Sequence, residues 1–159
     1  KTLDKLKSAS GRFEEIIYKK KSAKIIIDYA HTPDAMQNVL KSYTNKSFKP
    51  SLVFGCGGER DKSKRKKMSV IANKYAKKVY LTDDNPRNEN ANLIRKTLKK
   101  YCQKARDISN RRLAIQTAIS EMHQKDILII AGKGHEKYQI IKNKNYLFDD
   151  FKVAKDFIK

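Results

Sequence analysis

Four short apolar runs place the strongest constraint on how this chain folds. They cover residues 24–29, 51–55, 78–82 and 126–132. Together they are rich in β-branched residues, each is too short for a helix, and none alternates between apolar and polar positions. This pattern is typical of strands that are buried on both faces of a parallel sheet.

The segments between these runs have the spacing of amphipathic helices instead. Apolar side chains recur every three or four residues over 35–43, 68–76 and 93–101. Thr32 and Pro33 supply an N-cap and a first-turn proline for the first helix, and a further helix is expected over about 110–122. The segment before it, "KARDIS", is compatible with a short extra strand. This alternation predicts an α/β fold, a Rossmann-like, doubly wound, mostly parallel sheet flanked by helices.

The two ends of the chain complete the predicted fold. The stretch "YQIIKNKNYLFDD" predicts a C-terminal hairpin that turns at residues 143–145, followed by a closing helix over 151–158. Near the other end, "GRFEEIIYKK" is compatible with an edge strand. A length of 159 residues suits one domain. We expect this domain to cover residues 11–159, with residues 1–10 as a linker.

The formal charge of +20 first suggests a partner rich in phosphate. The surplus is mostly lysine spread through every segment, without the arginine stripe or the alternation of aromatic and basic residues that RNA-binding surfaces show. We therefore expect no nucleic-acid partner and keep a basic nucleic-acid-binding α/β module as the alternative. The same field would also attract small polyanions such as nucleotides.

Two further features bear on the compartment. No apolar run approaches the roughly 18 to 20 residues of a membrane-spanning helix, and the basic start lacks the apolar stretch of a signal peptide. Cys56 and Cys102 lie far apart and match no metal or redox spacing, so reduced thiols are expected. We expect a cytoplasmic protein without membrane contact.

A polar motif follows each of the four apolar runs. In chain order the motifs are "DYAHTPD", "GCGGERD", "TDDNPR" and "AGKGHE". The carboxyl ends of parallel strands share one edge of a sheet, and ligands bind in the crevice at that edge. We therefore expect the four motifs to converge on one site.

Both glycine-rich motifs have a simpler explanation as tight turns. The first has Arg60 where the third glycine of a dinucleotide fingerprint would stand, and the second has no serine or threonine after Lys133, so it is no Walker A loop. Arg60 nevertheless suits a carboxylate or a phosphate. A plain turn requires neither His135 nor Glu136.

The motif after the first run places Asp28 and His31 at a strand end. There a carboxylate could bind ribose hydroxyls and an imidazole could contact a phosphate. A metal site is the rival interpretation, but the chain has only three histidines, and His123 lies on a predicted helix without evident partners. We expect no metal ligands, and a packing or surface role for His123. No Gly-x-Ser-x-Gly elbow marks a serine nucleophile.

The motif after the third run points to a ligand with charges of both signs. Pro86 forces an extended or turn backbone at Asn85, which fixes Asp84 and Arg87 in a short loop. Arg87 could bind a carboxylate through two parallel hydrogen bonds, while Asp84 and Glu136 could accept from an ammonium group. Salt bridges that cap the sheet edge would explain the same residues, and both explanations stay open at this point.

Together the motifs resemble one known family. The stretches "GRFE", "DYAHTPDAM", "VFGCGGERDKSKR", "TDDNPR" and "AGKGHEKYQI", in this order, are similar to the C-terminal domain of the Mur ligases. The "DNPR" element resembles the signature of the MurE branch, which adds meso-diaminopimelate to UDP-N-acetylmuramoyl-L-alanyl-D-glutamate. The resemblance spans nearly the whole chain, from Gly11 to the closing helix. It implies a Rossmann-like domain that closes over a central ATPase domain.

The resemblance also implies roles for individual residues. Those that would bind diaminopimelate are Arg60, Asp84, Asn85, Arg87, Gly132 and Glu136. Those that would reach the nucleotide presented by the central domain are Arg12, Asp28 and His31. Arg87 would hold the carboxylate remote from the reacting amine, and no residue is assigned as a general base. Glu59 stands where many relatives have aspartate.

A larger departure concerns the rest of the enzyme. The family's phosphate loop, the lysine that becomes carbamylated and the UDP-binding domain have no counterpart in this sequence. The resemblance therefore implies a monomeric, inactive fragment whose residues 1–10 form a hinge from the central domain. ATP, Mg²⁺ and UDP-MurNAc-L-Ala-D-Glu would bind mainly the absent domains, and the amine of meso-diaminopimelate would attack an acyl phosphate. A free-standing nucleotide-binding domain is a third hypothesis.

Overall fold

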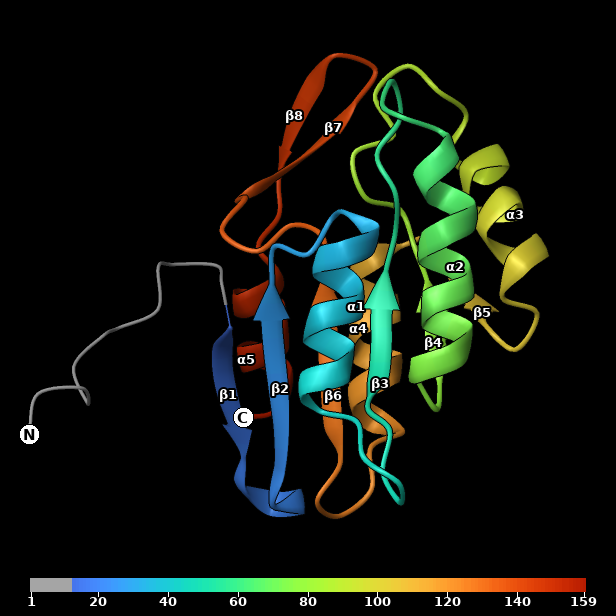
Figure 1. Ribbon diagram of the computed structural model, residues 1–159. Coiled ribbons are helices and arrows are strands. Elements are labelled where there is room, and N and C mark those ends of the chain that lie inside the picture. Colours follow the sequence, from blue (N-terminus) through green and yellow to red (C-terminus); the bar gives the residue numbers. More distant parts are fainter. Residues whose placement is uncertain (1–12) are drawn as a thin grey trace, which may run out of the picture.

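A six-stranded sheet runs through the middle of the molecule (Figure 1). The computed structural model describes residues 13–159. In spatial order the strands are β1 (Glu14–Tyr18), β2 (Ala23–Asp28), β6 (Ile127–Ala131), β3 (Ser51–Phe54), β4 (Val79–Leu81) and β5 (Arg106–Asp107). All neighbouring pairs are parallel except β1 with β2. The predicted mostly parallel sheet is confirmed, with the edge strand and the extra strand included.

Helices cover both faces of this sheet (Figure 1). One layer contains α1 (Pro33–Ser42), α2 (Ser63–Tyr75) and α3 (Ala91–Tyr101), and the other contains α4 (Arg111–Ser120) and α5 (Asp150–Phe157). A short 3-10 helix, η1 (Lys19–Lys21), joins β1 to β2. Strands β7 (Tyr138–Ile141) and β8 (Lys144–Leu147) form the hairpin, which stands above the carboxyl edge of the sheet.

The hairpin turns one residue earlier than predicted. The sequence places the turn at 143–145, but β8 already begins at Lys144. Lys142 and Asn143 form the turn instead, with φ angles of +47° and +59°. Two consecutive positive φ values are typical of the type I′ turn that best matches the twist of a two-residue hairpin.

Successive residues of the central strands pack against opposite helix layers. Ile26 lies in the cluster with α1, α2 and α3, while Ile25 and Ile27 lie in the cluster with α4 and α5. On β6, Ile129 lies in the first of these clusters and Leu128 lies in the second. All five side chains are fully buried, which explains why the apolar runs do not alternate with polar residues.

The predicted start of the first helix is confirmed. Thr32 is the N-cap of α1, its Oγ1 accepts from the Ala35 N–H at 3.3 Å, and Pro33 occupies the first turn. Asn110 caps α4 in the same manner, with its Oδ1 accepting from the Leu113 N–H at 3.0 Å. These caps fix the points where the chain leaves the upper edge of the sheet and enters a helix.

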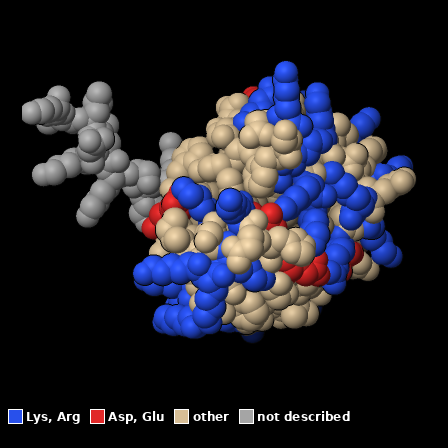
Figure 2. Space-filling model, turned by 90° about the horizontal axis from the view of Figure 1, so that it is seen from below, with Lys and Arg blue, Asp and Glu red and all other residues tan. Residues whose placement is uncertain are grey.

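The edge of the sheet opposite the hairpin is strongly basic, as Figure 2 shows from below. Exposed lysines in the connections at this edge are Lys19, Lys20, Lys46, Lys49, Lys77, Lys78, Lys104 and Lys125. Some of them complete the end of α2, because Lys49 donates to the Lys74 carbonyl at 2.9 Å and Lys104 donates to the Asn73 carbonyl at 2.7 Å. A helix C-terminus carries partial negative charge. Part of the lysine surplus therefore stabilises the fold and requires no anionic partner.

Both cysteines are buried and free, as the sequence predicts. Burial raises the pKa of the Cys56 thiol to about 12. At neutral pH this thiol is therefore protonated, and it packs as a small apolar group. Within residues 13–159, no helix combines the length and apolar character needed to cross a bilayer.

Candidate functional site

The four motifs that follow the parallel strands meet at one cavity of about 610 Å³. The cavity is lined by His31 after β2, Arg60 after β3, Arg87 after β4 and Glu136 after β6. The predicted convergence at the carboxyl edge of the sheet is confirmed. Opposite charges therefore face one shared space.

Most of the predicted site residues line this cavity, and one does not. Those that line it are His31, Arg60, Asp84, Asn85, Arg87, Gly132 and Glu136. Asp28 is buried beside it, where its carboxylate accepts from the Phe13 N–H at 3.1 Å and the Ala30 N–H at 2.8 Å. This position gives Asp28 a role in the fold and offers no support for the expected nucleotide contact. Arg12 lies outside the described residues.

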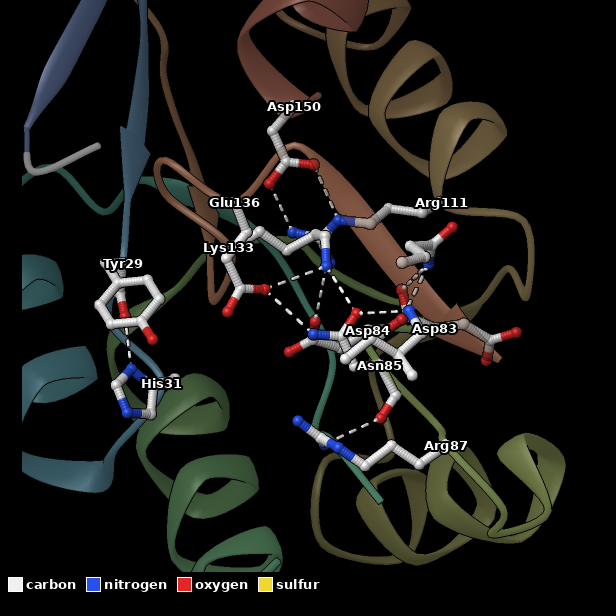
Figure 3. Close-up of polar contacts among 12 residues, drawn as sticks. Tyr29, His31, Asp83, Asp84, Asn85, Arg87, Arg111, Lys133, Glu136 and Asp150 are labelled. Atoms are coloured by element: carbon white, nitrogen blue, oxygen red, sulfur yellow. Dashed lines mark hydrogen bonds and ion pairs between the residues drawn. The ribbon is translucent and has the colours of Figure 1, made fainter. Parts of the chain in front are cut away.

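The loop after β4 sends its two adjacent carboxylates in opposite directions (Figure 3). Asp84 faces the cavity, whereas Asp83 pairs with Arg95 of α3. Arg95 also donates through Nε to Asp107 at 2.6 Å. Burial raises the pKa of Asp83 although the Arg95 hydrogen bond acts in the opposite sense. Of the two residues, only Asp84 therefore lines the cavity.

Arg87 has a strained backbone that the hairpin holds in place. Its φ angle is +52°, a left-handed conformation that is uncommon for a residue other than glycine. Its N–H donates to the Ile140 carbonyl at 3.0 Å, and its carbonyl accepts from the Lys142 N–H at 2.9 Å. Nη1 donates to the Gly58 carbonyl at 2.9 Å. Within the described part of the chain, Nε and Nη2 have no hydrogen-bond partner and remain available for a ligand.

The hairpin also holds the residues before Arg87. Gln139 donates through Nε2 to the Asp83 carbonyl at 3.1 Å and to the Asp84 carbonyl at 2.9 Å. The Ile140 N–H donates to Asn85 Oδ1 at 3.0 Å. The sequence predicts the hairpin but not this role. The only indication of this role in the sequence is that Gln139, whose amide can donate to two carbonyl groups, lies inside an otherwise apolar strand.

The loop after β3 runs directly against the loop after β4. The Gly58 N–H donates to the Asn85 carbonyl at 2.9 Å, and a Cβ atom on Gly58 would lie 2.0 Å from the Pro86 carbonyl oxygen. Only a residue without a side chain permits this approach. The glycines of this motif therefore do more than form a tight strand exit, because they let two loops of the site pack together.

We expect Gly58→Ala to destabilise the chain by about 1–3 kcal/mol, the usual cost of forcing extra atoms into a packed interior. Gly57→Ala is the matched control, since the nearest atom to its Cβ would be the side-chain Nη1 of Arg87 at 3.0 Å, and the nearest backbone atom, the Asn85 carbonyl oxygen, would be at an ordinary contact distance of 3.5 Å. Urea denaturation of both variants measures the free energy of unfolding. Equal stability of the two variants would contradict the close packing of the loops.

A buried lysine without a predicted role lies behind the acidic side of the cavity (Figure 3). The Lys133 side chain is 0% exposed. Its Nζ donates to Asn85 Oδ1 at 2.8 Å, and lies 3.3 Å from Glu136 Oε2 and 3.4 Å from Asp84 Oδ1. Asn85 in turn donates through Nδ2 to Glu136 at 3.0 Å. The Asn85 amide is therefore engaged with the protein at both ends.

A second buried ion pair supports this cluster from below. Arg111 of α4 donates through Nε and Nη2 to the two oxygens of Asp150 on α5, at 2.8 Å and 2.7 Å. Nη2 also donates to the Ala131 carbonyl at 3.1 Å, at the end of β6. Burial acts to lower the pKa of Arg111, but Asp150 outweighs it and the pKa is raised. The pair stays charged and fixes the strand end that leads to Lys133.

Aromatic and cationic groups form another side of the cavity. The rings of Tyr29 and His31 have centroids 4.5 Å apart, and His135 lies 5.0 Å from Tyr29. Lys64 of α2 donates to the His31 carbonyl at 3.1 Å. Burial, followed by the charge of Glu136, raises the pKa of Tyr29. A neutral phenol beside an imidazole and an ammonium group fits a phosphate or a nucleotide.

The described residues provide no evident site for a metal ion. Across residues 13–159, no group of three or more His, Cys, Asp or Glu side chains is arranged to hold one. Two of the four acidic residues that line the cavity, Asp84 and Glu136, already contact Lys133.

Comparison with known proteins agrees with this geometry. A family model described as "Mur ligase, glutamate ligase domain" matches residues 11–134. The UDP-N-acetylmuramoyl-L-alanyl-D-glutamate–2,6-diaminopimelate ligases of Rickettsia rickettsii and Buchnera aphidicola subsp. Baizongia pistaciae are 45% identical over 163 residues and 46% identical over 159 residues. A solved structure of a ligase with the same name superposes with a TM-score of 0.84 at 38% identity.

These relatives are much longer than the chain described here. The matches cover 99%, 96% and 97% of this chain, but 33%, 31% and 32% of the three relatives in the same order. The chain thus spans about a third of the length of the proteins that it matches. The family model covers more than half of the chain, and the cavity lies within the matched fold. The chain therefore belongs to the Mur ligase family, whose glutamate ligase domain it contains.

Proposed function

We propose that this chain is the amino-acid-binding domain of an ATP-dependent ligase that adds meso-diaminopimelate to UDP-MurNAc-L-Ala-D-Glu. The main support is the charge arrangement of the cavity, with Arg87 on one side and Asp84 and Glu136 on another. Each end of diaminopimelate carries an ammonium and a carboxylate on one carbon, and so requires acceptors and a guanidinium close together. The names of the relatives support the same substrate class.

Several of the predicted residues have a defined part in this arrangement. The open Nε and Nη2 edge of Arg87 would bind the carboxylate remote from the reaction, and Arg60, exposed at the cavity, would bind the second carboxylate. Gly132 leaves the approach to Asp84 Oδ2 open, since a Cβ there would lie 3.3 Å from this oxygen. The other amine of the ligand would then point toward an acyl phosphate. This domain contributes proximity and orientation.

The remaining substrates are assigned to the other domains of the full-length ligase. ATP supplies the phosphoryl group that activates the acceptor carboxylate, and Mg²⁺ neutralises the charge on that group. The histidine and lysine side of the cavity, formed by His31 and Lys64, is suited to touch a phosphate presented there. We place the full-length ligase in the cytoplasm as a monomer, where its nucleotide-linked acceptor is soluble.

Calorimetric titration of the full-length ligase with two amino acids tests this function. Lysine matches diaminopimelate except for the remote carboxylate, so Arg87 would lack its partner. We expect meso-diaminopimelate to bind and lysine to bind roughly 100-fold more weakly, the usual cost of an unpaired charged group in a binding site. Equal affinity for the two amino acids, or no binding of diaminopimelate, would overturn the proposal.

A further inference from the structure

The ammonium group of Lys133 is surrounded by hydrogen-bond acceptors of the protein. An ammonium group has three N–H donors, and the nearest oxygens of Asp84, Asn85 and Glu136 lie 2.8–3.4 Å from Nζ. Gly132 and a second glycine at 134 flank it with φ angles of +115° and +50°. These left-handed angles let the chain turn so that the side chain enters the protein instead of the solvent.

The contacts of Lys133 use only one oxygen of each carboxylate. Asp84 contacts it through Oδ1, and Glu136 contacts it through Oε2, which also accepts from Asn85. Among residues 13–159, Asp84 Oδ2 and Glu136 Oε1 have no hydrogen-bond partner. Both carboxylates line the cavity. One oxygen of each group is therefore anchored, and the other is left for a ligand.

The cluster of Lys133, Asp84 and Glu136 has a net negative charge. Asp84 and Glu136 contribute two negative charges and Lys133 contributes one positive charge, so the sum is −1. The Arg111–Asp150 pair beneath adds no net charge. One ligand ammonium group would neutralise the cluster. Without Lys133, the carboxylates of Asp84 and Glu136 would lose the ammonium group that both of them contact, and one would hold a proton to higher pH.

We propose that Lys133 is a positioning residue that acts as an internal counter-ion, orienting Asp84 and Glu136 so that their free oxygens accept one ligand ammonium group. This inference rests on the proposed function for the identity of the ligand. Lys133 does not touch the ligand itself, because its side chain is 0% exposed. It sets the number of positive charges that the cavity accepts and the direction of the two acceptors.

Other ionisable groups surround the cluster. Arg111 and Asp150 lie beneath it on α4 and α5, and the charges of Asp84 and Glu136 both act on Arg111. Across the cavity, the same two carboxylates act on Tyr29, where the charge of Arg60 acts in the opposite sense. Arg87, in the same loop as Asp84, also lines the cavity, and the phenol of Tyr138 acts on Tyr29. All of these residues are still present when Lys133 is substituted.

Replacing Lys133 with methionine in the full-length ligase tests the proposal. Methionine fills a similar volume without charge. We expect the KM for meso-diaminopimelate to rise on the order of 30-fold at neutral pH, as for loss of a charge-assisted hydrogen bond, with the KM for ATP unchanged. The affinity of the wild type, measured over the same neutral to mildly alkaline pH range, is the reference. In Lys133→Met it should rise with pH, as the retained proton is lost.

Two variants sharpen this test. Lys137→Met removes an exposed lysine of the same loop, which pairs with Asp149, and should leave both KM and the pH profile unchanged. Lys133→Ala removes the atoms that n-propylammonium contains, so millimolar n-propylammonium should restore diaminopimelate affinity, whereas n-butanol should not. Wild-type affinity with a flat pH profile in Lys133→Met would overturn the proposal. A pH-independent loss without amine rescue would equally overturn it, since that is the behaviour of a purely structural lysine.

A separate measurement keeps this inference distinct from the proposed function. Carboxyl ¹³C NMR follows the titration of Asp84 and Glu136 without any ligand. In Lys133→Met, or in Lys133→Ala without the amine, one of the two should titrate at clearly higher pH than in the wild type. Unchanged titration would overturn the role of Lys133 even if diaminopimelate binds. Failure of the wild type to bind diaminopimelate would overturn only the proposed function.

Discussion

Replacing Arg87 with alanine in the full-length ligase is expected to raise the KM for meso-diaminopimelate roughly 30- to 1000-fold. Arg87 lines the cavity, its Nη1 is held by the Gly58 carbonyl at 2.9 Å, and its Nε and Nη2 have no hydrogen-bond partner among the described residues. A carboxylate bound there would lose both hydrogen bonds and the neighbouring charge. Removing one partner of such a pair costs about 2–4 kcal/mol, and each 1.4 kcal/mol changes affinity tenfold. Steady-state kinetics with diaminopimelate as the varied substrate measures the effect.

The controls separate this effect from a loss of structure. Alanine and arginine meet similar strain at the φ angle of +52°, so Arg87→Ala should not relax the loop. Arg106→Ala removes an exposed arginine of β5 that pairs with Glu121, and should leave the KM unchanged. Arg87→Lys keeps the charge but not the planar fork, and should fall between wild type and alanine. An equal rise in the KM values for ATP and diaminopimelate in Arg87→Ala would argue against the assigned subsite.

The second large effect is expected on stability. Arg111→Met should lower the free energy of unfolding by about 3–5 kcal/mol, because it leaves the Asp150 carboxylate buried without its partner. Both side chains of this pair are 0% exposed, so water cannot replace the lost contacts. The Ala131 carbonyl would also lose a donor at the end of β6. Urea denaturation of the chain, followed by circular dichroism, measures the change.

A double variant tests whether the pair or the single charge matters. Arg111→Met combined with Asp150→Leu removes both charges, and should recover much of the stability lost in Arg111→Met alone. The free-energy cycle over the two sites then gives the coupling between them. If the double variant is as unstable as the sum of the two single variants, the two residues do not act as a pair.

The sheet and its helices could be predicted because the strands are short continuous apolar runs and the helices have apolar residues at every third or fourth position. Ile25, Ile26 and Ile27 are all apolar since helices cover both faces of β2, and the polar motifs follow because parallel strands end at one edge. The error at the hairpin arose from its turn. Lys142 and Asn143 adopt positive φ values although neither is a glycine. The sequence therefore gives no strong indication of where the turn lies.

The sequence identifies the residues of the site that have suitable side chains, but it does not show which other residues those side chains contact. Asp83 and Asp84 look equivalent in sequence, but Arg95, twelve residues later, takes the first of them away from the cavity. Lys133 looks like one of many surface lysines, but it is buried, and its ammonium group contacts residues of the loops after β4 and β6. Asp28 has a carboxylate at a strand end, yet two backbone N–H groups use it. Contacts between distant segments decide all of these cases.

A crystal structure of the full-length ligase with bound meso-diaminopimelate tests the central claim most directly. The claim is that loops following four parallel strands form one cavity that binds an amino acid by both of its charges. We predict that the remote carboxylate lies against Nε and Nη2 of Arg87, and that the ammonium group on the same carbon lies within hydrogen-bonding distance of Asp84 and Glu136. An amino acid bound outside this cavity, or one whose ammonium group points away from both carboxylates, would contradict the account.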